Sequence, residues 1–182
     1  MSRLAPALLL ASLCAGACTR SVGTARTTDE ARARIAVLLD APDAGATEFA
    51  SIGAEAVPAL QAELLDERSP DARRLAAARA LADLPDGTGL GALGDAVGAP
   101  RLRPALRDAV AEELGSHGRD QAVTRLSPLL GSADPAIRSA AARGLGRAGG
   151  AAARKSLEDR LEREDDPGVR EQLQASLARS QP

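Results

Sequence analysis

The strongest constraint on the fold is an alanine-rich phrase that the chain repeats. RLAAARAL begins at Arg74 and RSAAARGL begins at Arg138, and six of their eight positions are identical. Arg103 and Arg170 fit the same column as these two arginines, with successive spacings of 29, 35 and 32 residues. Residues three, four and seven positions after each arginine are mostly apolar, which predicts one buried stripe on each of four helices. We expect these helices over residues 70–84, 100–115, 134–148 and 166–179.

A second kind of helix is expected before each copy of the phrase. Thr28 or Asp29 is the expected N-cap of an earlier example at 28–40, whose partner helix is degenerate. Pro128 lies inside its segment and is expected to kink that helix. Helix pairs at a period of about 30–35 residues predict an all-α fold, an α-solenoid of about five helix-turn-helix repeats over residues 28–182. The segments with this second pattern are 54–65, 89–97, 120–130 and 151–162.

The composition supports this all-helical prediction. Phe49 is the single aromatic residue, and the chain contains no tryptophan and no tyrosine. Alanine, leucine and arginine are abundant instead, and these residues favour helices over strands. A sheet would need more of the aromatic and β-branched side chains that fill pleated surfaces.

The segment IGAEAVPALQAELLDERSPDARRLAAARALADL resembles a HEAT repeat of the short bacterial kind, called PBS-lyase HEAT-like. SADPAIRSAAARGLGRAGG resembles the second half of the same unit, and the resemblance extends over residues 28–181. It implies an armadillo-like helical solenoid that binds partners on its second helices, which line the concave face. The residues that carry the resemblance are Gly53, Ala56, Val57, Pro58, Leu60, Leu64, Arg74, Ala77, Ala78, Ala80 and Leu81.

The same resemblance implies a structural role for the arginine column. In such repeats, an arginine near the start of a helix often pairs with an acid in the preceding turn. The alternative is that the column captures phosphate or carboxylate groups. The column is Arg74, Arg103, Arg138 and Arg170, and the acids placed for pairing are Asp66, Asp134 and Asp166.

The N-terminal segment MSRLAPALLLASLCAGAC has the parts of a secretory signal. Arg3 gives a short positive region, an apolar segment follows, and small residues precede Cys18. About fourteen apolar residues reach ~21 Å, which is too short for the ~30 Å hydrocarbon core of a membrane. Ala-Gly-Ala-Cys resembles the lipobox of bacterial lipoproteins, although Ala15 stands where leucine is usual. We expect a signal peptide over 1–17, lipidation of Cys18 and a flexible tether over 18–27; the alternative is secretion as a soluble periplasmic protein.

Few residues are candidates for catalysis. His117 is the single histidine and lies in the turn-like segment GSHGRD, and no cysteine follows Cys18. A lone histidine is a poor metal site, so we expect no metal, no cofactor and no enzymatic activity. A net charge of −2 and the lack of aromatic stacking platforms argue against binding of nucleic acid. We interpret the acidic clusters as solvated surface; they are Glu112 with Glu113, and Glu162 with Glu164, Asp165 and Asp166.

One face of the second helices is the predicted interaction surface. An extended peptide or a protein surface with alternating charge would fit this face. The sequence therefore predicts a scaffold or adaptor for protein partners, held at the bacterial cell envelope through an N-terminal lipid in the membrane. The alternatives are a chromophore-lyase-related enzyme and a chaperone-type protein. Positions five and nine after the arginines lie opposite the buried stripe and hold Arg79, Asp83, Asp108, Glu112, Arg143, Arg147 and Arg179.

Overall fold

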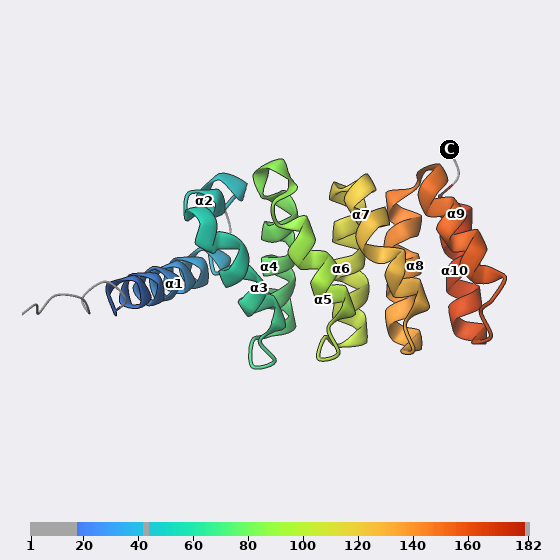
Figure 1. Cartoon of the computed structure of the whole chain (residues 1–182), viewed down its shortest axis with the longest axis horizontal. Coiled ribbons are helices and arrows are strands. Elements are labelled where there is room, and N and C mark those ends of the chain that lie inside the picture. Colours follow the sequence, from blue (N-terminus) through green and yellow to red (C-terminus); the bar gives the residue numbers. More distant parts are fainter. Residues whose placement is uncertain (1–17, 42–43, 181–182) are drawn as a thin grey trace, which may run out of the picture.

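The protein is a row of helix pairs arranged in two layers. The computed structural model describes residues 18–41 and 44–180, and every regular element within these residues is helical. The first layer contains α1 (Cys18–Leu39), α3 (Ala56–Leu65), α5 (Leu90–Gly98), α7 (Arg119–Leu126) and α9 (Gly150–Leu161). The second layer contains α2 (Ala46–Ala50), α4 (Asp71–Asp83), α6 (Pro104–His117), α8 (Pro135–Ala148) and α10 (Pro167–Arg179). Figure 1 shows the pairs following one another in chain order, with α1 projecting at one end.

Contacts run along each layer and between the layers. In the second layer, α4 contacts α6, α6 contacts α8, and α8 contacts α10. The first layer repeats this order, and the two helices of each pair also pack on one another. Short 3₁₀ turns lie between some of the helices, at η1 (Gly53–Glu55), η2 (Pro85–Gly87) and η3 (Pro128–Gly131). This architecture confirms the all-α solenoid expected from the sequence.

Proline and aspartate determine where the second helices begin. A proline occupies the first turn of three of them, where its missing N–H costs nothing. The carboxylates of Asp134 and Asp166 also cap α8 and α10, because each accepts a hydrogen bond from a backbone N–H of the first turn. The prolines are Pro104, Pro135 and Pro167.

The register of the third repeat differs from the one expected. α6 begins at Pro104, so Arg107, rather than Arg103, is the fourth residue of this helix. The prediction that Arg103 belongs to the repeated column of arginines is wrong. The segment Pro100-Arg-Leu-Arg103 has the same Pro-X-X-Arg pattern as Pro104-Ala-Leu-Arg107, but the helix begins at the second of these segments. Arg103 lies at the N-cap of α6 and forms an ion pair with Asp71. The structural column is Arg74, Arg107, Arg138 and Arg170, with even spacings of 33, 31 and 32 residues.

Glycines on the second helices, within and beside the repeated phrase, allow these helices to pack closely. Gly115 of α6 faces Gly144 of α8, and a Cβ atom at Gly115 would lie 2.3 Å from the Gly144 carbonyl oxygen. A Cβ atom at Gly146 would lie 2.7 Å from Cβ of Ser176 on α10. Because real Cβ contacts are longer than this, a larger residue at either position would push the helices apart. The close approach of the helices therefore explains the small residues.

The core is a continuous row of leucine and alanine side chains between the two layers. Leu81, Leu114 and Leu145 each follow their column arginine by seven residues and are completely buried. Leu177 holds the same position in α10 but is only partly buried, because no described helix packs beyond α10. Burial of one such leucine contributes about 1.5–3 kcal/mol.

Two segments differ from their predictions. Residues 18–27 belong to α1 instead of forming a flexible tether, and Thr28, an expected N-cap, lies inside this helix. A helix that has already formed over 28–39 extends at little cost into a segment without proline. Pro128 ends α7 at Leu126 and begins η3 rather than kinking one long helix. Residues 1–17, where we expect the signal peptide, lie outside the described residues.

Leu145→Ala is expected to lower the free energy of unfolding by about 2–5 kcal/mol, because it leaves a cavity between the layers. Urea denaturation followed by far-UV circular dichroism measures this change. Val37→Ala, at a side chain that is 70% exposed, is the control and should change the free energy by less than about 0.5 kcal/mol. Equal stability of the two variants would contradict the assignment of Leu145 to the core.

Candidate interaction surface

Each arginine of the structural column bonds to carbonyl groups at the end of the preceding first-layer segment. Arg74 Nε donates to Leu64 O at 2.8 Å, and Arg107 Nε donates to Val97 O at 3.0 Å. The last carbonyls of a helix have no partner within it, and a positive charge is favourable there. The arginines therefore join the two helices of a repeat and do not face a ligand. The corresponding bonds of Arg138 and Arg170 are to Ser132 O and Leu161 O, both at 3.0 Å.

The acids expected to pair with this column have other partners. Asp134 and Asp166 cap their helices, and Asp66 accepts a hydrogen bond from Arg68 N at 2.9 Å. Asp134 and Asp166 bond to backbone groups because a short side chain at a helix start reaches the free N–H groups first, whereas Asp66 lies at the end of α3 and bonds to the N–H two residues later in the loop. The three expected aspartates therefore do not form the ladder, and other acids pair with the column: Arg74 Nη1 lies 3.6 Å from Asp71 Oδ1, and Arg138 Nε lies 2.8 Å from Glu164 Oε2.

Glu164 forms a buried ion-pair cluster that sequence reasoning missed. Arg138 donates to both of its carboxylate oxygens at 2.8 Å, and Arg160 donates to Oε2 at 2.7 Å and 3.0 Å. The hydrogen bond from Arg138 is the largest cause that lowers the pKa of Glu164 to about 2. Arg160 and the backbone N–H of Asp166 act in the same direction, against the effect of burial. The side chain is 1% exposed, so the interpretation of Glu164 as solvated surface is wrong.

The seven predicted partner-binding residues lie on the second layer, and several of them pair with one another. Arg143 Nη2 lies 3.5 Å from Asp108 Oδ2, and Arg143 Nη1 lies 3.8 Å from Glu112 Oε1. Arg179 Nη1 also lies 3.8 Å from Glu112 Oε1, although Arg179 is two repeats away from Glu112. These pairs connect α6 with α8 and α10, so one glutamate links three repeats.

A groove of about 480 Å³ opens on this face, and we call it the second-helix groove. It brings together four of the seven predicted residues, whereas Asp83, Asp108 and Arg143 do not line it. α4 and α10 are not neighbours in the row, yet both contribute side chains to the groove. The lining residues are Leu75 and Arg79 of α4; Ala109, Glu112, Glu113, Ser116 and His117 of α6; Arg147 of α8; and Arg179 of α10.

His117 and Glu113 are groove residues that the sequence did not single out as partner-binding. Glu113 Oε1 lies 3.2 Å from Arg79 Nε, and His117 Nε2 lies 3.2 Å from Asp83 Oδ1. His117 is the last residue of α6, one turn after Glu113, rather than part of a turn between helices. The sequence spacing of four residues between Glu113 and His117 could have indicated that they lie together, because residues four apart share one helix face.

Two charged residues beside the groove, Asp108 and Arg143, are partly removed from solvent. Burial is the main cause that raises the pKa of Asp108, and the neighbouring charge of Glu112 acts in the same direction. Arg143 opposes this rise through its positive charge. Arg143 Nε is itself buried, and no hydrogen-bond partner for it lies within the described part of the chain. The contact between α6 and α8 therefore contains partly desolvated charges.

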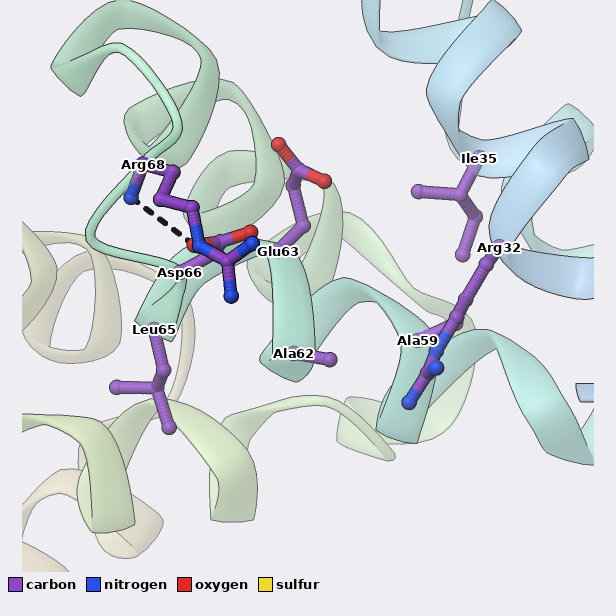
Figure 2. A pocket seen from close by; sticks show the side chains of 8 residues that line it. All are labelled: Arg32, Ile35, Ala59, Ala62, Glu63, Leu65, Asp66 and Arg68. Carbon is purple, nitrogen blue, oxygen red and sulfur yellow. Dashed lines mark hydrogen bonds and ion pairs between the residues drawn. The ribbon is translucent and has the colours of Figure 1, made fainter. Parts of the chain in front are cut away.

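A second hollow, of about 410 Å³, lies on the first layer between α1 and α3. Figure 2 shows Arg32 and Ile35 extending from α1 toward Ala59 of α3. At its other end, Arg68 N donates to Asp66 Oδ1. None of the seven predicted partner-binding residues lines this hollow, so the sequence and the structure together favour the second-helix groove.

Within residues 18–41 and 44–180, no helix combines the length and the apolar character needed to cross a membrane. Nor do the described residues contain a group of three or more histidine, cysteine, aspartate or glutamate side chains placed to hold a metal ion.

Comparison with known proteins finds one family. Residues 99–178 match the family model described as HEAT repeats, and this range covers α6 to α9 and nearly all of α10. A comparison with curated proteins finds no match. HEAT repeats generally mediate protein–protein interaction. Residues 99–178 are therefore similar to HEAT repeats, and the described residues as a whole form an all-α solenoid.

Arg107→Ala and Arg103→Ala test the corrected register. Arg107→Ala should lower the free energy of unfolding by about 1–3 kcal/mol, because it leaves the buried carbonyl of Val97 without its donor and removes one of the two donors to Ala99 O. Arg103→Ala, at an exposed ion pair, should cost less than about 1 kcal/mol. Chemical denaturation of both variants measures the difference. If Arg103→Ala lowered the free energy of unfolding more than Arg107→Ala, Arg103 would belong to the structural column, as expected from the sequence.

Glu164→Gln tests the buried cluster through its pH dependence. The folded-state pKa of Glu164 is depressed, so its ionised form stabilises the fold above the ordinary pKa, and this stabilisation is lost as the pH falls toward 2. The stability difference between wild type and Glu164→Gln should therefore shrink by about 2 kcal/mol between pH 5 and pH 2. Thermal unfolding across this range measures it. Glu171→Gln, at an exposed side chain on α10, is the matched control. A difference that is independent of pH for Glu164→Gln would refute the prediction.

Proposed function

We propose that this protein is a non-enzymatic scaffold or adaptor that binds partner proteins on its second layer. The observation that carries the proposal is the second-helix groove, because four consecutive second helices contribute side chains to it. A surface assembled across several repeats suits an extended protein segment better than a compact small molecule. The general role of HEAT repeats in protein–protein interaction supports the same conclusion.

The non-enzymatic part of the proposal rests on the residues available for chemistry. The sequence offers a single histidine, and its ring Nδ1 lies 2.9 Å from the Glu113 carbonyl oxygen. A general base also needs a substrate or nucleophile within hydrogen-bond reach. We assign His117 to the wall of the groove, with no catalytic role, and we propose no cofactor or metal for this site.

We further propose that the protein is exported and held at the cell envelope by a lipid on Cys18. The apolar segment, the small residues before Cys18 and the lipobox-like Ala-Gly-Ala-Cys support this proposal. α1, the first helix of the described residues, projects from the end of the row (Figure 1). A lipid at this end would leave the second layer accessible to partners. Secretion as a soluble periplasmic protein is the alternative.

Site-specific photo-crosslinking tests the interaction surface. A benzophenone amino acid at Ala109, in the groove, should capture a discrete partner in the native cell, and mass spectrometry identifies that partner. The same amino acid at Ala152, an exposed position on α9, is the control and should not capture it. Capture of the same protein at Ala152 and not at Ala109 would move the interaction to the first layer.

Metabolic labelling with a fatty-acid analogue tests the lipid. Wild type should carry the label and fractionate with membranes, whereas Cys18→Ala should lose both properties, because the acylated thiol is absent. Equal labelling of the two proteins would refute lipidation of Cys18. An unlabelled, soluble wild type in the exported fraction would establish the alternative instead.

A further inference from the structure

The charges that line the second-helix groove do not cancel. Its arginines are Arg79, Arg147 and Arg179, and its carboxylates are Glu112 and Glu113. Glu113 lies 3.2 Å from Arg79, and Glu112 lies 3.8 Å from Arg179. Within the described residues, no carboxylate lies within ion-pair distance of Arg147. The groove therefore contains one guanidinium whose charge is not matched by the protein.

Arg147 is held in place by the close packing of α6 against α8. Its Nε atom donates to Ser116 Oγ at 2.8 Å, and Ser116 Oγ in turn donates to Glu112 O at 2.8 Å. A Cβ atom at Gly115 would lie 3.0 Å from Arg147 Cβ, so the missing side chain of this glycine makes room for Arg147. Because Nε is occupied, the two Nη groups remain to bind a ligand. A guanidinium that is already oriented loses less entropy when it binds.

Arg179 provides a second positive charge at the same groove. Its ion pair with Glu112 is long, and both side chains are more than two-fifths exposed. Such a pair contributes little to stability, so Arg179 can turn toward a stronger partner at small cost. Arg147 and Arg179 belong to successive second helices, α8 and α10, and both line the groove.

We propose that Arg147, assisted by Arg179, forms a carboxylate-binding site for an acidic side chain in an extended segment of a partner protein. A planar carboxylate matches the two Nη groups of a guanidinium and forms short, charge-assisted hydrogen bonds. Leu75 and Ala109 offer apolar contact to the neighbouring residues of such a segment. This inference rests on the proposed function, since it specifies the chemistry by which the groove recognises a partner.

Nuclear magnetic resonance of the arginine Nε–Hε groups tests the site. The probe is the peptide acetyl-Gly-Glu-Gly-amide at low ionic strength, and acetyl-Gly-Gln-Gly-amide is its uncharged counterpart. The Glu peptide should produce saturable shifts at Arg147 and Arg179, whereas the Gln peptide should produce none. Equal shifts from the two peptides would overturn the proposal, and so would inorganic phosphate that binds more tightly than the Glu peptide, because the site would then be a general anion site.

Three variants separate the role of Arg147 from general electrostatics. Arg147→Gln should weaken binding of the Glu peptide at least about fivefold, because it removes charge-assisted hydrogen bonds. Arg147→Lys keeps the charge without the fork of donors and should bind with intermediate affinity. Arg101→Gln removes an exposed arginine outside the groove and should leave binding unchanged. Wild-type affinity in both Arg147 variants would overturn the proposal, and circular dichroism verifies that each variant is folded.

Photo-crosslinking distinguishes failure of this site from failure of the proposed function. If Ala109 captures a partner equally well with and without Arg147→Gln, the scaffold proposal stands and the carboxylate site is refuted. If Arg147→Gln reduces capture and Arg101→Gln does not, both proposals are supported.

Discussion

The bond from arginine to the end of the preceding first-layer segment is the interaction on which the repeats depend. In the second pair, Arg74 is almost fully buried and donates to Leu64 O; in the third pair, Arg107 does the same to Val97 O. A buried guanidinium is costly unless its donors are used, and helix-end carbonyls are acceptors that would otherwise lack partners. One side chain therefore joins the two helices of a repeat, although Arg74 Nη2 is buried without a hydrogen-bond partner among the described residues. The even spacing of these arginines follows from this shared geometry.

The period and the buried stripe could be predicted because they depend on local periodicity. Leu81 and Leu145 follow from the helical spacing of apolar residues, and the structure buries both completely. The third repeat was misread because two Pro-X-X-Arg segments lie side by side, and only packing decides which of them begins the helix. Once Arg107 occupies the column, the residue seven positions after the arginine is Leu114, whereas counting from Arg103 would place Val110 there.

The candidate site was predictable only in outline. Amphipathic spacing placed Arg79, Glu112, Arg147 and Arg179 on one face, and the structure brings them to one groove. Their pairing was not predictable, because it depends on the rotation from one repeat to the next rather than on spacing within a helix. Glu164 shows the same limit: the arginine that most strongly binds it comes from the previous repeat, and nothing local distinguishes it from neighbouring surface acids.

The contact between α6 and α8 combines two kinds of interaction, a steric contact and a set of ion pairs. Underneath, Gly115 meets the backbone of Gly144, and this steric contact is insensitive to salt. At the surface, Arg143 of α8 bridges to α6 through ion pairs of 3.5 Å and 3.8 Å, and Arg179 of α10 bridges to α6 at 3.8 Å; dissolved ions screen such pairs. We therefore expect the row of helix pairs to become more flexible as the ionic strength rises, while its secondary structure persists. The width of the groove would then vary with the medium around the protein.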